Sequence, residues 1–159
     1  MNNITIRMSK TKLSNEILPR VGVGGLIFDK RKGVLLLLRN RPPEVGHWSI
    51  PGGKVEFQEP IEDALKREVK EELEIEIKVV SLLGVTDHMI PKENIHWVSP
   101  CYLVKIVSGR IKNLEPKKSS RIKWFSLNNL PKNIAIPARR AIHSYTSLTL
   151  HPKKYPPVN

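Results

Sequence analysis

The chain has 159 residues, of which 40% are hydrophobic and 26% are charged, a composition typical of one globular domain with its own core. The formal net charge of +12 favours acidic partners such as nucleotides, although the scatter of the basic residues, taken alone, favours a merely solvated surface. Cys101 is the only cysteine, which excludes an intrachain disulfide and favours a cytoplasmic location. The longest apolar run, Val34 to Leu38, is too short to span a bilayer, which excludes a membrane helix.

The sequence predicts one domain between two loose ends. Residues 1–18 are polar, lack a clear hydrophobic period and contain no apolar core of a signal peptide, so we expect an N-terminal extension. Residues 149–159 are rich in proline and lysine and are predicted to form a flexible tail. Neither a repeat nor a linker interrupts residues 19–148, which form the predicted domain.

The domain begins with a predicted β-hairpin. Residues 21–28 are β-branched and apolar, with glycines that weaken a strand unless something packs close to its backbone. Residues 30–33 predict a turn, and residues 34–38 predict a buried second strand. The prolines and glycine within residues 39–47 predict a loop after this strand.

The clearest helix signal covers residues 60–74, where Pro60 suits the first turn. The other predicted elements are strands over residues 75–85, 95–107 and 121–127, a loop over residues 88–94 and a terminal helix over residues 137–148. Pro100 implies that its strand lies at an edge or contains a bulge. Segregated strands with a few helices favour an α+β fold, in which helices cover a mixed β-sheet.

Carboxylates interrupt the apolar face of the helix over residues 60–74. At about 100° per residue, one side of the helix gathers the apolar residues Ile61, Ala64, Leu65, Val69 and Leu73. Glu68 and Glu72 fall within about 20° of Ile61, and Glu71 falls beside Ala64 at the margin. Unpaired carboxylates that face a core are costly to bury, and carboxylates on adjacent turns also repel one another.

A divalent cation would remove both penalties. Residues at i, i+3 and i+4 share one helix face, so Glu68, Glu71 and Glu72 can converge on a metal cluster, with Arg67 orienting Glu71. Oxygen ligands favour hard ions, so the predicted cofactor is Mg²⁺ or Mn²⁺. The alternative is a solvated helix surface laced with salt bridges. We favour metal binding because the carboxylates occupy the apolar stripe, whereas the lysines occupy the outer face.

These residues also form a motif. Gly53, Glu59, the pair Arg67-Glu68, the pair Glu71-Glu72 and Ile75 follow the spacing of the Nudix box, which the sequence therefore resembles. One position departs from the pattern, because Glu74 stands where the box has a glycine that ends the helix in a left-handed cap. We expect this change to extend or reshape the helix end. The similarity to MutT-type members of the family covers roughly residues 19–146.

The resemblance implies a Nudix-type α/β/α sandwich and a hydrolase of phosphorus-containing acid anhydrides. Such an enzyme would cut a diphosphate linkage in a nucleoside diphosphate derivative, and the expected partner is a small nucleotide. Pro91 lies where the resemblance places a proline typical of ADP-ribose hydrolases, with an ordinary loop proline as the equal alternative. Residues 19–25 and 92–94 look closer to enzymes that cleave (d)NTPs. Both substrates therefore stay open.

The resemblance also implies a set of site residues. Glu68, Glu71, Glu72 and the Gly53 carbonyl would be the metal ligands, and Glu59 would orient the cluster. Relatives often add a distal acid from a later loop, but in this chain that loop reads Glu115-Pro116-Lys117-Lys118. Glu115 and Glu93 are the candidates for the distal acid, and Glu68 and Glu72 are alternatives for the general base.

Four further residues are candidates for substrate contacts. Arg39 and Arg41 precede the box, and their guanidinium groups suit phosphate oxygens, with two surface arginines as the equal alternative. Trp48 and Trp97 suit stacking on a base or ribose, and core packing is again an equal alternative.

Other classes of function stay open beside the hydrolase. The positive charge is compatible with a non-catalytic module that binds nucleotide or RNA, or with an RNA 5′-end pyrophosphatase. The intact glutamate set argues against the non-catalytic module. The sequence does not fix the oligomeric state, allows a homodimer and contains nothing that predicts membrane binding.

Overall fold

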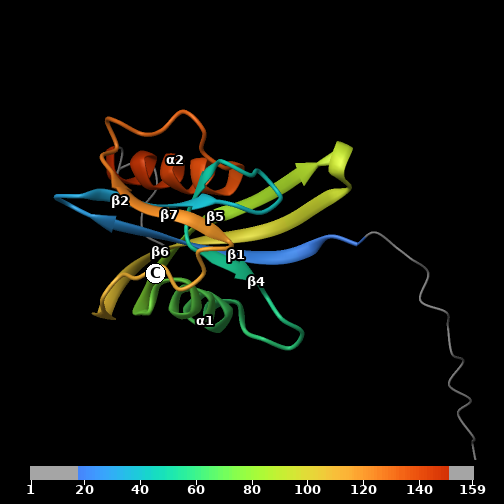
Figure 1. The fold of residues 1–159 in the computed structure, drawn as a ribbon, viewed down its shortest axis with the longest axis horizontal. Helices are drawn as coiled ribbons and strands as arrows, with labels where there is room; N and C mark the ends of the chain where they lie inside the picture. Colours follow the sequence, from blue (N-terminus) through green and yellow to red (C-terminus); the bar gives the residue numbers. More distant parts are fainter. Residues whose placement is uncertain (1–17, 151–159) are drawn as a thin grey trace, which may run out of the picture.

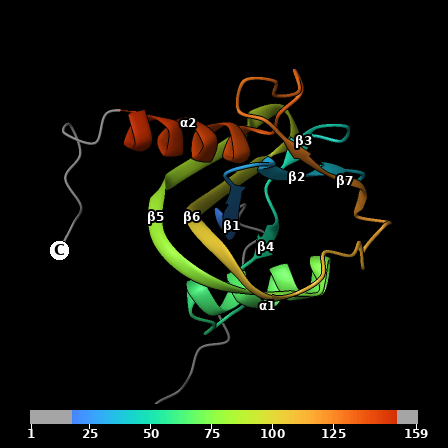
Figure 2. The same cartoon turned by 90° about the vertical axis from the view of Figure 1, so that its left-hand side faces the viewer.

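Two helices lie on opposite sides of a mixed β-sheet in the computed structural model, which describes residues 18–150 (Figures 1 and 2). This arrangement confirms the predicted α+β sandwich. Residues 1–17 of the predicted N-terminal extension and residues 151–159 of the predicted tail lie outside the described residues, while the first two residues of that tail, Thr149 and Leu150, end the last helix. Neither described helix has the length and apolar character that crossing a bilayer requires.

The elements follow the predicted order closely. They are β1 (Arg20–Asp29), β2 (Gly33–Arg39), β3 (Trp48–Ser49), β4 (Gly52–Lys54), α1 (Ile61–Leu73), β5 (Ile75–Ile90), the 3₁₀ helix η1 (Pro91–Glu93), β6 (Ile95–Gly109), β7 (Ser119–Phe125) and α2 (Ile136–Leu150). Strand β1 is central: it pairs in parallel with β6 and antiparallel with β2 and β4. Strand β5 continues the sheet beyond β6, while β3 and β7 pair with β2.

Two hydrophobic cores form because the central strands are apolar on both faces. Alternate residues of β2 point in opposite directions, so Leu35 and Leu37 pack toward α1, whereas Val34 and Leu36 pack toward α2. The α1 core adds Leu65, Val69, Leu73, Ile75, Ile77 and Val104, and the α2 core adds Leu26, Trp48, Ile50, Ala138, Ala141 and Ile142. Each helix is therefore fixed to its own face of the sheet, and α1 is held against β1 and β4.

A glycine of β1 shows why this strand tolerates so little bulk. A Cβ atom added to Gly24 would lie 2.6 Å from the Cδ1 atom of Ile50, which packs directly against the β1 backbone. The expectation that something approaches this glycine-rich strand closely is therefore confirmed.

One expectation about β5 and β6 is wrong, and the other is confirmed in one of its two forms. The predicted loop over residues 88–94 is largely strand and 3₁₀ helix, because β5 continues to Ile90 and pairs residue by residue with β6, including His88 with Trp97. These long-range pairings override the local turn signals. Strand β6 also lies between β1 and β5 and not at an edge, but the predicted irregularity is present, because the β5–β6 register shifts between Leu82 and Gly84, next to Pro100.

The end of α1 differs from the expectation based on Glu74. The helix is not extended: it stops at Leu73, and Glu74 itself adopts the left-handed conformation, with φ 58° and ψ 30°. Its N–H donates to the Lys70 carbonyl at 3.0 Å, so the chain turns as a glycine cap would turn. The Glu74 carboxylate pairs with Lys112, a contact between exposed side chains that contributes little to stability.

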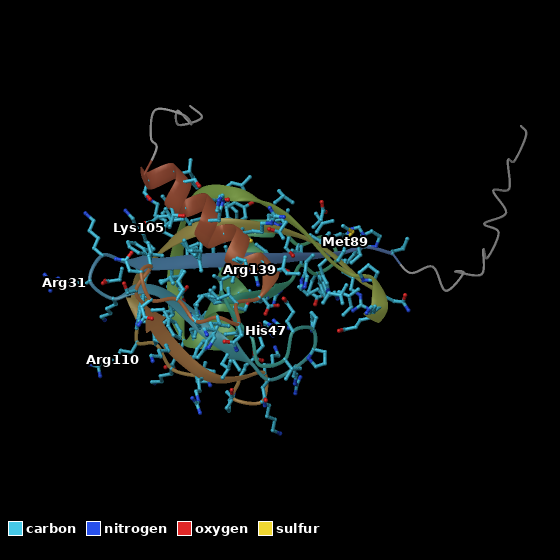
Figure 3. The ribbon with its side chains drawn as sticks, turned by 90° about the horizontal axis from the view of Figure 1, so that it is seen from above. Arg31, His47, Met89, Lys105, Arg110 and Arg139 are labelled. Atoms are coloured by element: carbon cyan, nitrogen blue, oxygen red, sulfur yellow. The ribbon has the colours of Figure 1, made fainter. Side chains whose placement is uncertain are left out.

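Basic residues are distributed over separate parts of this fold. Arg31 lies in the turn after β1, Arg110 follows β6, and Arg139 belongs to α2 (Figure 3). The scatter seen along the sequence therefore persists in space for these labelled residues.

The left-handed conformation of Glu74 leads to a stability prediction. Glu74→Gly removes the clash of a Cβ atom at positive φ, so the free energy of unfolding should rise by about 1 kcal/mol in urea denaturation. Glu74→Ala, which also loses the Lys112 contact but keeps the Cβ atom, should show no such gain. Equal stability of the two variants would contradict this interpretation of the helix cap.

Candidate functional site

A cavity of about 490 Å³ lies where the predicted site residues meet. Its wall is formed by β1, β4, α1, the loop after β2, the β5–β6 hairpin, the segment before β7 and the start of α2. Among the described residues, the polar or charged residues with buried side chains are Glu68, Glu72, Thr86, His88, Ser99 and Ser119. All of them except Thr86 line the cavity. Buried polarity in this protein is therefore concentrated at one place, as a binding site requires.

The α1 glutamates divide into two kinds. Glu68 and Glu72 are buried, with 8% and 9% of their surfaces exposed, and both line the cavity. The Glu71 side chain is 50% exposed and lies beside Arg67, outside the cavity lining. Within residues 18–150, no three carboxylate, histidine or cysteine side chains converge closely enough to form a metal-binding group. The structure thus brings two of the three predicted ligands together.

Gly53 of the box and the preceding residue, Gly52, let the backbone approach these carboxylates. A Cβ atom on Gly53 would overlap the carboxyl group of Glu68, so no other residue fits there without moving Glu68. The Gly52 N–H donates to Glu72 Oε2 at 3.0 Å. The glycine turn therefore lies in direct contact with the carboxylate pair of α1.

Arg67 links the carboxylates around the site. Its Nε and Nη2 atoms donate to the Glu59 carboxylate at 2.8 and 2.9 Å, in a bidentate pair. Its Nη1 atom donates to Glu68 at 2.9 Å and, at a longer 3.3 Å, to Glu71. Arg67 also donates to the Lys54 carbonyl at 3.0 Å, which fixes α1 to β4. The predicted pairing of Arg67 with Glu71 is present, but Glu59 and Glu68 are the nearer partners.

Charge at the site is only partly balanced. Hydrogen bonds from Arg67 lower the pKa of Glu59 to about 2, so that carboxylate is ionised at neutral pH. Burial raises the pKa of Glu72 to about 8, and the nearby carboxylates of Glu68 and Glu115 add to the rise. Two adjacent buried carboxylates without a full set of cationic partners are the donor set that suits a hard divalent ion.

Both predicted phosphate-binding arginines line the cavity. Arg39 donates from Nε to the Pro43 carbonyl at 2.6 Å, and this bond holds the loop after β2 in place. Burial lowers the pKa of Arg39, and the charges of Glu44 and Glu72 oppose this effect. The guanidinium group of Arg39 therefore lies close enough to Glu72 of α1 and to Glu44 to interact with the charge of each.

The two candidate tryptophans occupy different environments. Trp97 lines the cavity and lies under the guanidinium of Arg20, 5.6 Å from the ring centroid. Trp48 is buried in the α2 core and packs edge-on against Phe125, with ring centroids 4.7 Å apart. Core packing, the alternative given for each tryptophan, therefore describes Trp48, while Trp97 keeps access to the cavity.

Sequence reasoning missed a polar pair on the wall opposite α1. Glu44 accepts the Ile136 N–H at 3.0 Å, and its Oε2 atom lies 3.2 Å from Nε2 of the buried His88. These contacts lower the pKa of Glu44 despite the opposing effect of burial. No local sequence motif predicts this pair, because Glu44 lies in the loop after β2 and His88 lies near the end of β5.

The two candidates for a distal acid lie in different places. Glu93 belongs to η1 at the tip of the β5–β6 hairpin and does not line the cavity. Glu115 is close enough to Glu72 to raise the pKa of that carboxyl, and its own Oε2 atom is buried without a partner among residues 18–150. Its Oε1 atom forms an ion pair with Nζ of Lys118, a residue of the cavity wall, at a distance of 2.7 Å.

Comparison with known proteins identifies the fold and the motif together. The family model described as the NUDIX domain matches residues 18–145. The crystal structure of a MutT NUDIX hydrolase from Burkholderia pseudomallei is 40% identical in sequence and superimposes with a TM-score of 0.76. That alignment covers 80% of this chain and 98% of the Burkholderia chain.

Two curated relatives differ in the substrates that their names state. The ADP-ribose pyrophosphatase of Methanocaldococcus jannaschii is 36% identical over 127 residues, which cover 80% of this chain and 73% of that protein. The 8-oxo-dGTP diphosphatase of Proteus vulgaris is 38% identical over 72 residues, which cover 45% of this chain and 64% of that protein.

The burial of Glu72 leads to a prediction for the chain freed of divalent ions with EDTA. Because the folded state raises the Glu72 pKa from 4.5 to about 8, it keeps a proton that the unfolded state releases. Wild-type stability should therefore fall from pH 4.5 to pH 8, whereas Glu72→Gln avoids this loss. In thermal melts, the variant should exceed the wild type by several degrees at pH 8 and match it near pH 4.5.

Glu62→Gln provides the matched control, because Glu62 is an exposed acid in the first turn of the same helix. Its Tm difference from the wild type should stay small at both pH values. If the Tm difference between Glu72→Gln and the wild type does not change with pH, the folded state does not raise the pKa of Glu72, and this interpretation is refuted.

Proposed function

The chain belongs to the Nudix family of hydrolases that act on phosphorus-containing acid anhydrides, and we propose that it cuts a diphosphate linkage in a nucleoside diphosphate derivative with the help of divalent metal ions. The observation that carries the proposal is the buried pair Glu68 and Glu72 at the wall of a cavity large enough for a small-molecule substrate. Hydrophobic residues would be more stable at both positions unless a bound cation used the carboxylates.

The proposed metal ligands are Glu68, Glu72 and the Gly53 carbonyl, with Glu71 on the same helix as a further ligand. This set consists of oxygen atoms, which fits Mg²⁺ or Mn²⁺. When bound, a divalent ion would supply positive charge against the diphosphate oxygens and would make the attacking water more acidic. The clash that a Cβ atom on Gly53 would have with Glu68 supports a role for this glycine beside the ligands.

Side chains around the metal ligands would orient those ligands and bind the phosphate groups of the substrate. Arg67, held by Glu59, fixes Glu68 in place and supports the end of β4. Arg39 and Arg41 would donate to phosphate oxygens from the loop side of the cavity. The proton of the attacking water would pass to Glu68 or Glu72, the α1 carboxylates that line the cavity.

ADP-ribose is the first candidate substrate. The relative named for that substrate aligns over 80% of this chain, whereas the relative named for 8-oxo-dGTP aligns over 45%. Nucleoside triphosphates are the second candidate, supported by the likeness to the relative named as an 8-oxo-dGTP diphosphatase. In either case Trp97, on the cavity wall, is available to stack on the base or sugar.

A product analysis with Mg²⁺ and Mn²⁺ tests the reaction. ADP-ribose should give AMP and ribose 5-phosphate, whereas a triphosphate cut between its α and β phosphorus atoms should give a nucleoside monophosphate and pyrophosphate. RNA with a 5′-triphosphate end should be included, because the net charge of +12 also suits that substrate. Absence of any product across the panel would leave a binding module and would overturn the hydrolase proposal.

Substitution of the buried pair tests the assignment of the site. Glu68→Gln and Glu72→Gln should each lower kcat about 100-fold or more, because each removes a charged ligand without changing the shape of the side chain. Glu62→Gln on the exposed first turn of α1 should leave kcat within about twofold of the wild type. Full activity in either variant of the buried pair would refute the role of that glutamate.

A further inference from the structure

The segment between β6 and β7 brings a lysine to the carboxylate side of the cavity. Lys118 lines the cavity, and its side chain is 43% exposed. Glu68 and Glu72 are close enough to act electrostatically on its ammonium group. The family resemblance implied a distal acid from a later loop, with Glu115 of this segment as a candidate, but the charged residue of the segment that lines the cavity is Lys118.

The backbone of this segment is tied to the end of α1. The Lys112 N–H donates to the Leu73 carbonyl at 3.0 Å, and the Leu114 N–H donates to the Glu72 carbonyl at 3.0 Å. These bonds satisfy carbonyls in the last turn of the helix. They also fix the start of the segment next to the residue that carries one of the proposed metal ligands.

A closed turn then sets the direction of Lys118. The Asn113 side chain accepts the Glu115 N–H at 3.2 Å and donates to the Ser119 carbonyl at 2.6 Å, so it bridges the two ends of the turn. The Lys118 N–H donates to the Glu115 carbonyl at 2.9 Å. On the other side, the Asn40 N–H donates to the Lys118 carbonyl at 2.8 Å. Lys118 is therefore held by backbone contacts from both neighbouring segments.

Glu115 holds the ammonium group itself. Its Oε1 atom lies 2.7 Å from Lys118 Nζ, and its side chain is only 27% exposed. The other carboxylate oxygen, Oε2, is buried without a hydrogen-bond partner in the described part of the chain. A carboxylate in this position needs a nearby positive charge, and Lys118 provides it.

We propose that Lys118 donates hydrogen bonds to the phosphate oxygens of the bound diphosphate, with Glu115 as the residue that positions its ammonium group. This inference rests on the proposed function, because only a diphosphate substrate places such oxygens beside Glu68 and Glu72. Lys118 would thus join Arg39 and Arg41 as a residue that contacts the phosphate groups.

The electrostatics of the cavity favour this role. The carboxylates of α1 repel a diphosphate unless positive charge lies close by. The cationic side chains among the described cavity residues are Arg39, Arg41, Lys54 and Lys118. Lys118 acts on both Glu68 and Glu72, so its charge lies where a phosphate must approach them.

Calorimetric titration with α,β-methylene-ADP in Mg²⁺ tests the proposal without turnover. Lys118→Met should raise the Kd of this analogue about tenfold, because it removes one charge-assisted hydrogen bond. Lys117→Met is the matched control: it removes the same charge from the neighbouring exposed residue, which does not line the cavity, and should change the Kd less than about twofold. Lys118→Arg should recover most of the affinity.

Three outcomes would overturn the proposal: equal Kd values for Lys118→Met and Lys117→Met, equal Kd values for Lys118→Met and Lys118→Arg, and failure of the wild type to bind the analogue. If Lys118→Met melts at a lower temperature than the wild type, Lys118→Gln provides the same comparison. A wild type that binds through Lys118 but hydrolyses nothing would overturn the hydrolase proposal alone. Hydrolysis that is indifferent to Lys118 would overturn the lysine proposal alone.

A double-mutant cycle tests the positioning role of Glu115. Glu115→Gln should weaken binding of α,β-methylene-ADP about threefold in the wild type and should have no effect on the Lys118→Met variant. Equal losses in both backgrounds would show that Glu115 acts on the fold and not through Lys118.

Discussion

The burial of Glu68 and Glu72 on the core face of α1 is the constraint on which the site depends. The same helix face must pack Leu65, Val69 and Leu73 against the sheet, so the two carboxylates cannot turn away to solvent without moving the helix. Any negative charge that they carry must then be balanced locally. Arg67 balances part of it, and the remainder creates the demand for cations around the cavity.

The neighbouring backbone is adapted to the same constraint. Gly52 donates its N–H to Glu72, and Gly53 leaves the space that the Glu68 carboxyl occupies. The segment after β6 bonds to the last turn of α1 and carries Lys118 to the cavity wall. Elements far apart in the sequence thus contribute either space or positive charge to one carboxylate pair.

The sequence predicted the parts of the fold that follow from local periodicity. The structure has a strand and a helix where the sequence predicted the apolar strand over residues 34–38 and the amphipathic helix over residues 60–74. Each hydrophobic pattern indicates one type of secondary structure. The extension of β5 to Ile90 was not predictable, because it depends on pairing with β6. The left-handed cap at Glu74 was also missed, because the chain turns there despite the lack of a glycine.

The site was predictable to the extent that a motif encodes it. The helix wheel alone indicated that Glu68 and Glu72 face inward, and the structure buries both. It could not show that Glu71 stays at the surface, because Glu71 falls at the margin of the apolar stripe. The pair of Glu44 with His88 and the approach of Lys118 arise from tertiary contacts, which no spacing in the sequence reveals.

Direct measurement of Mn²⁺ binding tests the central claim that the buried carboxylates form a cation site. In an electron paramagnetic resonance titration without nucleotide, the wild-type chain should take up Mn²⁺ and reduce the signal of the free ion. The double variant Glu68→Gln/Glu72→Gln, folded as judged by circular dichroism, should leave the free signal unchanged. Equal uptake by the double variant and the wild type would contradict the account, because the buried glutamates would then serve no metal.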